Sequence, residues 1–215
     1  MAYDLLLLDF GGVCLLNPVE LHHRAEAHLG LAPGTFTWLG PVDPSTDELW
    51  LRMIAGDGVT ERDYWAMRPS DVGAAAGREL TLRQYMTMLY DPPTPEMIRP
   101  EATAVVQQAR SAGLPMSVLT NDMRAFHGEA WEKQINFLDL AEHIVDCSVT
   151  NILKPDPRAY QRAIDITGVA PESMLFVDDQ PLNVEGASAA GIDAMWFDIA
   201  NPDTSWQAVA ERLGI

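Results

Sequence analysis

A run of four leucines, residues 5–8, is followed by Asp9 and by the glycines Gly11 and Gly12. A continuous apolar run of this length is typical of a strand that is buried on both faces of a parallel sheet. The glycines allow a tight turn and let backbone N–H groups come close to a ligand. The pattern predicts a buried strand that ends at a single carboxylate, although Asp in this position is also an ordinary turn residue.

The stretch that follows has helical patterns and no convincing second strand. Helices are predicted over residues 18–29, 45–55, 60–67 and 81–90. Asn17 is suited to cap the first of these and Pro18 to occupy its first turn. A proline-rich segment, residues 91–95, marks the return of the chain. We therefore predict a helical cap domain over residues 17–91, inserted into a core that is formed by residues 1–16 and 92–215.

After this insertion, apolar runs alternate with amphipathic segments. Strands are predicted over residues 114–119, 144–148, 174–177 and 194–197, and helices over residues 101–112, 156–167, 183–190 and 205–213. Such alternation favours an α/β fold with a doubly wound parallel, Rossmann-like sheet. The insertion would then follow the first strand of this sheet.

Polar residues follow the predicted strands in three places besides Asp9. Thr120 and Asn121 end one strand, Lys154 lies in a Lys-Pro-Asp-Pro segment, and Asp178 and Asp179 end another strand. The carboxyl ends of parallel strands meet at one edge of a sheet, where ligands bind in open α/β folds. Each motif alone has an ordinary interpretation, as a helix cap, a solvated loop lysine or an acidic turn. Together they predict one polar crevice.

The composition limits the choice of partners. The net charge is −17, and such an acidic surface repels nucleic acid and anionic membranes. No apolar run is long enough to span a membrane, and no basic segment typical of a signal peptide precedes the first strand. Two cysteines, Cys14 and Cys147, lie in apolar segments, which favours buried thiols and a reducing, cytoplasmic location. The sequence does not indicate an oligomeric state.

The four motifs, in this order, resemble those of the haloacid dehalogenase (HAD) superfamily, and specifically its phosphatase branch with a helical C1-type cap after the first strand. The resemblance extends from about Asp4 to Phe197. The segments over residues 98–101 and 183–187 are also similar to sugar-1-phosphate phosphatases of that branch. The resemblance implies Mg²⁺-dependent hydrolysis of a small phosphorylated metabolite through an aspartyl-phosphate intermediate.

The resemblance also implies where the metal would bind. Asp9 would be the nucleophile and a Mg²⁺ ligand, together with the backbone carbonyl of Gly11 and the carboxylate of Asp179. Asp178 would be a further ligand through water or an orienting partner, and Asn183 matches a supporting position. Carboxylate and carbonyl oxygens are the hard ligands that Mg²⁺ prefers.

The remaining motifs would hold the phosphate. In the family, a hydroxyl and a backbone N–H bind a phosphate oxygen, which here implies Thr120 and Asn121, together with the turn at Gly11 and Gly12. Lys154 would neutralise the phosphate and keep the like-charged carboxylates together. A single lysine charge is sufficient for this role.

Gly11 is a departure from the family pattern, because most such phosphatases have Asp two residues after the nucleophile. That second Asp is the general acid and base, a contribution of roughly 10²–10⁴-fold in rate. His22 or His23 could replace it, although both are more naturally interpreted as surface helix residues. Two alternatives to a phosphatase therefore stay open: a catalytically weak or silent binding or regulatory domain, and a 2-haloacid dehalogenase, which also uses a strand-end Asp but needs no metal.

Overall fold

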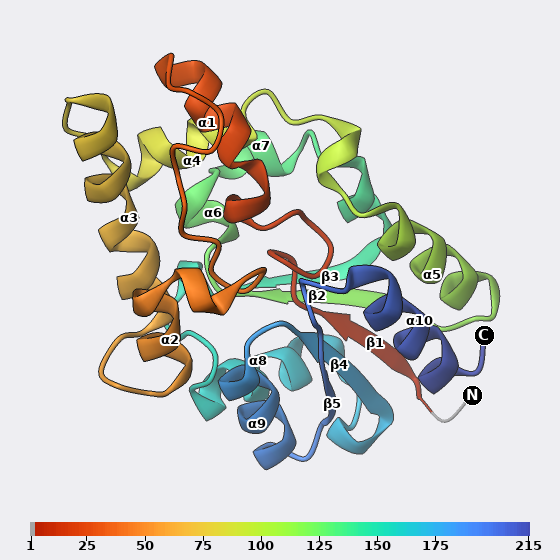
Figure 1. The fold of residues 1–215 in the computed structure, drawn as a ribbon. Coiled ribbons are helices and arrows are strands. Elements are labelled where there is room, and N and C mark those ends of the chain that lie inside the picture. Colours follow the sequence, from red (N-terminus) through yellow and green to blue (C-terminus); the bar gives the residue numbers. More distant parts are fainter. Residues whose placement is uncertain (1–2) are drawn as a thin grey trace. The chain divides into compact units, whose positions relative to one another are not determined.

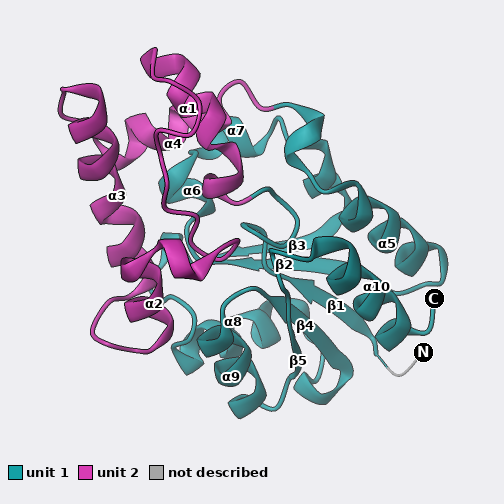
Figure 2. Cartoon of the chain, in the orientation of Figure 1, with its two compact units in different colours: residues 1–16, 94–215 teal, residues 17–93 magenta. Residues whose placement is uncertain are grey.

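The computed structural model describes residues 3–215 of the chain. The fold comprises two compact units, one formed by Met1–Leu16 with Thr94–Ile215 and the other by Asn17–Pro93 (Figure 2). We call them the core unit and the inserted unit, and each is described by itself. No helix in the described part of the chain is both long and apolar enough to cross a membrane.

The core unit is built on one five-stranded sheet in which every neighbouring pair of strands is parallel (Figure 1). This confirms the predicted α/β class. The strand order is β3-β2-β1-β4-β5, so the leucine run lies in the centre of the sheet. The strands are β1 Leu5–Leu8, β2 Met116–Thr120, β3 Ala141–Asp146, β4 Met174–Asp178 and β5 Asp193–Trp196.

Four longer helices cover the two faces of this sheet, α8 and α9 on one face and α5 and α10 on the other (Figure 1). Each begins with proline in its first turn, where the missing N–H costs no hydrogen bond. Short helical turns connect β2 to β3. The helices are α5 Pro100–Ser111, α6 Met123–Phe126, α7 Glu129–Glu132, α8 Pro157–Thr167, α9 Pro181–Ala189 and α10 Pro202–Leu213.

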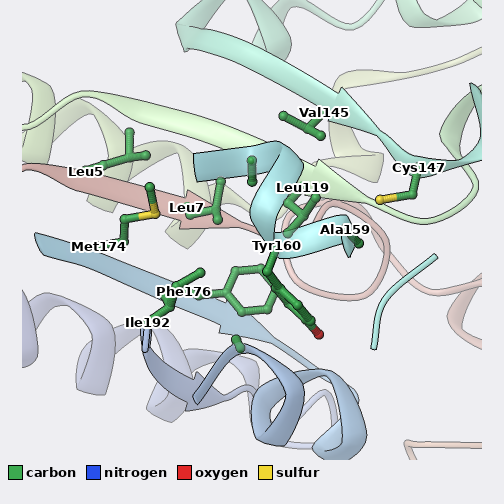
Figure 3. Close-up of a cluster of buried hydrophobic side chains, with 12 residues drawn as sticks. Leu5, Leu7, Leu119, Val145, Cys147, Ala159, Tyr160, Met174, Phe176 and Ile192 are labelled. Carbon is green, nitrogen blue, oxygen red and sulfur yellow. The ribbon is translucent and has the colours of Figure 1, made fainter. Parts of the chain in front are cut away.

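The leucine run supplies both faces of the sheet, because successive side chains of a strand point in opposite directions. Leu5 and Leu7 belong to the buried cluster under α8 and α9 (Figure 3). In this cluster the ring of Tyr160 from α8 contacts the edge of Phe176 from β4, with ring centroids 6.2 Å apart. Leu6 and Leu8 are also fully buried. A strand that is buried on both faces explains why the run is apolar at every position.

The inserted unit is helical, with three differences from the sequence prediction. The segment predicted as a helix over residues 45–55 divides into a 3₁₀ turn over Pro44–Thr46 and the α-helix α2, Glu48–Ile54. The segment 18–29 begins with a 3₁₀ turn over Pro18–Leu21, and the α-helix α1 covers only His22–Leu29. The third helix, α3, does not end at residue 67 but continues through a buried Pro69 to Ala76. Helix α4 covers Leu82–Tyr90.

Helix α3 tolerates Pro69 because its ends and its buried face stabilise it. Thr60 and Asp63 form a capping box at the start, and Gly77 ends the helix in the left-handed conformation. Pro69 is itself buried, as are Trp65 and Val72 on the same helix. Packing of this face offsets the hydrogen bond that proline removes. The predicted end of this helix at residue 67 was therefore too early.

A polar and aromatic cluster lies inside the inserted unit. The guanidinium of Arg68 lies 4.2 Å from the ring centre of Trp38 and 4.3 Å from that of Tyr64, and it forms an ion pair with the buried Asp47. The ring of His22 packs against two rings, with its centre 4.2 Å from that of Trp38 and 5.4 Å from that of Phe36. The interpretation of His22 as a surface residue was wrong, since it is only 6% exposed; His23 is exposed.

The environment of His22 predicts a dependence of stability on pH. Burial lowers its pKa to about 4, and the described residues offer neither ring nitrogen a hydrogen-bond partner in good geometry. In the unfolded chain this histidine takes up a proton as the pH falls below 6.5. In the folded chain it stays neutral down to about pH 4. We expect this histidine to remove stability as pH falls through that window, by up to roughly 1.4 kcal/mol per pH unit.

The measurement is the free energy of unfolding by urea between pH 7.5 and 4.5. The difference in stability between wild type and His22→Leu should change across this range, with the variant losing less stability on acidification. His23→Leu, at the exposed neighbouring position, is the control and should follow the wild-type curve. Parallel curves for wild type and His22→Leu would contradict this account of His22.

Candidate active site

Asp9 lies directly after β1, at the carboxyl edge of the sheet. Its backbone N–H donates to the carbonyl of Val177 at 2.9 Å, which continues the pairing of β1 with β4 by one residue. Asp9 is 6% exposed, and its carboxylate accepts a hydrogen bond from the N–H of Phe10 at 2.7 Å. Because β1 is the central strand of the sheet, the buried carboxylate at its end lies between the ends of β2 and β4.

The two glycines after Asp9 differ in what they require. Gly12 has φ +81°, and a Cβ there would lie 2.7 Å from Ile199 and 3.1 Å from the carboxylate of Asp179. Its carbonyl accepts a hydrogen bond from Nε of the buried Arg99 at 3.0 Å, a contact that the sequence did not indicate. Gly11 is exposed, its φ lies outside the left-handed region, and a Cβ there would meet nothing within 4 Å. The left-handed glycine of this turn is therefore Gly12, and the backbone does not require glycine at position 11.

Lys154 joins two strand ends through its ammonium group. Its Nζ lies 2.6 Å from Asp178, 3.0 Å from Asp9 and 2.9 Å from the carbonyl of Leu119, and the residue is 4% exposed. Burial acts to lower the pKa of the ammonium, but Asp178 and Asp9 outweigh it and raise the pKa well above its ordinary value. Lys154 is therefore a permanent positive charge in this cluster.

The side chain of Asn121 positions Lys154. Its Oδ1 accepts from the backbone N–H of Lys154 at 2.8 Å, and its Nδ2 donates to the carbonyl of Lys154 at 3.2 Å. This arrangement was not expected from the sequence, which pointed to the backbone of Asn121 as a phosphate contact. Thr120 is the last residue of β2 and is 5% exposed. The Thr-Asn pair thus lies at the same edge of the sheet as Lys154.

The neighbouring acids Asp178 and Asp179 have different surroundings. Asp178 is fully buried, and its two carboxylate oxygens accept from Lys154, from the N–H of Gln180 at 2.8 Å, and from Nδ2 of Asn183 at 3.0 and 3.2 Å. Asp179 is 5% exposed, and its Oδ2 accepts from Nε2 of Gln180 at 3.2 Å. Asp178 is therefore occupied by protein donors on both oxygens.

Three of the carboxylates are close enough to share one cation. Asp9, Asp178 and Asp179 each offer an oxygen, and these three atoms lie within 4.8 Å of one another. All three residues are buried, and every donor is a hard oxygen, which is the ligand type that Mg²⁺ prefers. The donor set therefore fits a magnesium ion.

The electrostatics of Asp9 are consistent with the need for a cation. Burial raises its pKa to about 7, and the charge of Asp178 acts in the same direction. Lys154 and the N–H of Phe10 act against this rise. Lys154 thus offsets only part of the effect of burial on the pKa of Asp9.

The comparisons with known proteins agree with this geometry. Residues 3–191 match the family model of haloacid dehalogenase-like hydrolases. The chain is 26% identical to the mouse acyl-CoA dehydrogenase family member 10, over 99% of this chain but 19% of that protein. It is 32% identical to phosphatase MT3486 of Mycobacterium tuberculosis, over 61% of this chain and 57% of that one. The chain thus spans less than two thirds of the length of these curated relatives.

Solved structures show the same fold. The HAD-hydrolase YfnB of Bacillus subtilis, which was solved bound to magnesium, superimposes with a TM-score of 0.73 at 16% identity, over 99% of each chain. Curated phosphatases and 2-haloacid dehalogenases both occur among the more distant sequence matches. Together with a family model that covers most of the chain, these findings show that the protein belongs to the haloacid dehalogenase-like hydrolases.

Proposed function

We propose that this protein is a Mg²⁺-dependent phosphatase that hydrolyses a small phosphorylated metabolite through an aspartyl-phosphate intermediate on Asp9. The observation that carries this proposal is the buried cluster of Asp9, Asp178 and Asp179 with one ammonium group, that of Lys154. Three carboxylates against one ammonium leave two uncompensated negative charges when all are ionised. A divalent cation balances them and allows a phosphate dianion to approach Asp9.

The ligands would be Asp9, Asp179 and the carbonyl of Gly11. The bound Mg²⁺ would supply positive charge to the phosphate oxygens and reduce their repulsion from the carboxylates. Asp178 is the less suitable direct ligand, because both of its oxygens already accept from Lys154, Gln180 and Asn183. Its role would be to hold Lys154 next to Asp9.

The reaction would proceed in two steps. A carboxylate oxygen of Asp9 attacks phosphorus, and the bond from phosphorus to the ester oxygen breaks; that oxygen leaves with its electron pair and takes a proton from solvent. Water then attacks the phosphorus of the aspartyl phosphate. The bond to Asp9 breaks, inorganic phosphate is released, and the displaced proton returns to solvent. Lys154, Thr120, Gly12 and the backbone N–H of Asn121 would bind the phosphate oxygens during both steps.

The inserted unit would serve as the cap that selects the substrate. It contributes no member to the carboxylate and lysine cluster, all of which comes from the core unit. The strongly acidic net charge disfavours nucleic acid as a substrate. Cys14 and Cys147 are buried and form no disulfide, which is compatible with a reducing, cytoplasmic compartment.

Position 11 narrows the substrate class within this proposal. Asp in place of Gly11 would supply the proton to the leaving oxygen, and a Cβ at this position would meet nothing within 4 Å. Lys154 is a poor substitute, since its raised pKa keeps the proton on the ammonium. The favoured substrates are therefore phosphates whose leaving oxygen carries negative charge well, such as sugar 1-phosphates.

The first test concerns the nucleophile. Asp9→Asn keeps the shape of the side chain but cannot form an acyl phosphate, so turnover of an aryl phosphate with Mg²⁺ should fall to background. Unfolding should remain cooperative. Wild type without phosphatase activity would support the silent-domain alternative, and chloride release from a 2-haloacid without metal would support the dehalogenase. Substantial turnover by pure Asp9→Asn would exclude Asp9 as the nucleophile.

The second test separates the two neighbouring acids. Asp179→Asn should weaken Mg²⁺ binding, measured by titration calorimetry, by at least about tenfold, with little change in the stability of the metal-free protein. Asp178→Asn leaves the buried Lys154 with a single carboxylate partner, so it should lower the free energy of unfolding by about 3 kcal/mol. Equal Mg²⁺ affinity in wild type and Asp179→Asn would rule out Asp179 as a ligand.

The third test concerns Gly11. Single-turnover rates of phosphoryl transfer should rise steeply as the pKa of the leaving group falls across a series of phosphate esters, because no acid assists departure. Gly11→Asp should flatten this slope and accelerate alkyl phosphates by roughly 10²-fold or more, the range of positioned proton transfer. Gly11→Asn, which has the same size but is not an acid, is the control. A flat slope in wild type would mean that another group already donates the proton.

A further inference from the structure

Trp196 is an exposed aromatic residue next to the candidate site. It is the last residue of β5, at the edge of the sheet, and it is 53% exposed. Within residues 3–215 it is the one aromatic among the large hydrophobic residues that are exposed. Burial of apolar surface therefore explains little of why a tryptophan occupies this position.

The indole N–H of Trp196 bonds to the main chain of Asp179. Nε1 donates to the carbonyl of Asp179 at 2.9 Å. Trp196 lies opposite Asp178 in the pairing of β4 with β5, and the N–H of Phe197 donates to the carbonyl of Asp178, also at 2.9 Å. The carbonyls of Asp178 and Asp179 are thus both held at the end of β5, the first by the backbone N–H of Phe197, just after the strand, and the second by the side chain of Trp196.

The hydrogen bond from the indole of Trp196 to the carbonyl of Asp179 lies beyond the end of β4, outside the backbone pairing of the sheet. Strand β4 ends at Asp178 and helix α9 begins at Pro181, so Asp179 lies in the short connection between them. The indole extends the edge strand by one bond and holds the peptide from which the Asp179 side chain projects. The carboxylate itself accepts from the neighbouring Gln180 amide at 3.2 Å, a long hydrogen bond.

We propose that Trp196 is a positioning residue that holds Asp179 in the orientation required to bind Mg²⁺. The proposal rests on the function proposed above, in which Asp179 is a metal ligand. Groups that orient a metal ligand without touching the metal influence metal affinity strongly. An edge-strand residue outside the four family motifs would thereby set the strength of metal binding.

The test is Mg²⁺ binding to the full-length protein without substrate, measured by titration calorimetry. Trp196→Phe keeps an aromatic ring and removes the N–H, and it should weaken Mg²⁺ binding roughly tenfold. The thermal unfolding midpoint in EDTA should change little, because the side chain is half exposed. If Trp196→Phe folds poorly, site-specific replacement of Trp196 by benzothienylalanine removes the N–H while it keeps the bicyclic shape.

Trp206→Phe is the control for the chemical change alone, at an indole that is 1% exposed. It makes the same chemical change at an indole whose N–H has no acceptor among the described residues, and it should leave Mg²⁺ affinity unchanged. Unchanged affinity in Trp196→Phe and in the benzothienylalanine protein, with affinity lost in Asp179→Asn, would overturn this inference alone. Unchanged affinity in Asp179→Asn would overturn the proposed metal site and this inference with it. Equal losses of affinity in Trp196→Phe and Trp206→Phe would indicate a general structural effect and would also overturn it.

Discussion

The arrangement of the site depends on one buried ammonium group. Lys154 lies within 3.0 Å of two carboxylates, Asp9 and Asp178, which come from adjacent strands and would otherwise repel each other. Taking such charges out of water is costly, and the cost is offset only where the geometry and the hydrogen bonds are nearly complete. Here the third donor position of Lys154 is filled by the carbonyl of Leu119. Through this ion triad of Asp9, Lys154 and Asp178, together with the carbonyl of Leu119, Lys154 links the ends of β1, β2 and β4.

The sheet topology makes this triad possible. With β1 between β2 and β4, residues far apart in the chain reach the same edge without any irregular excursion of the backbone. Asn121, at the end of β2, holds the backbone of Lys154, and Asn183, on α9, holds the carboxylate of Asp178. These amides contribute no charge, yet they set the direction of the charged groups. A rigid frame around the carboxylates is the condition for a defined metal site.

The two glycines in the turn after Asp9 are there for different reasons. Gly12 is required by geometry, because its φ is positive and Asp179 and Ile199 leave no room for a side chain. Gly11 is required by neither backbone nor space. The fold therefore does not account for the glycine at this position, which is why the proposed function assigns its meaning to the leaving group of the substrate. A change at Gly11 should alter substrate range without altering the architecture.

Much of the core unit was predictable because its signals are local. The all-leucine strand, the polar residues at the strand ends and the alternation of strands with helices each occupy a few consecutive positions, and they indicated the α/β sheet and the edge at which the motifs meet. The cap at Asn17 was also predictable, and its side chain accepts a hydrogen bond from the N–H of Val19. The sequence by itself therefore determined the class of fold, the family resemblance and the candidate residues.

Only the tertiary structure decided how those residues are used. Pro69 remains inside a helix because its neighbours bury that face, and His22 is buried by rings that follow it in the chain. The side chain of Asn121 bonds to Lys154, 33 residues away, and the indole of Trp196 bonds to Asp179, 17 residues away. Hydrogen bonds and burial of this kind depend on partners outside any local window. A pattern of apolar and polar positions cannot specify them, because it records which side chains are present but not which ones meet.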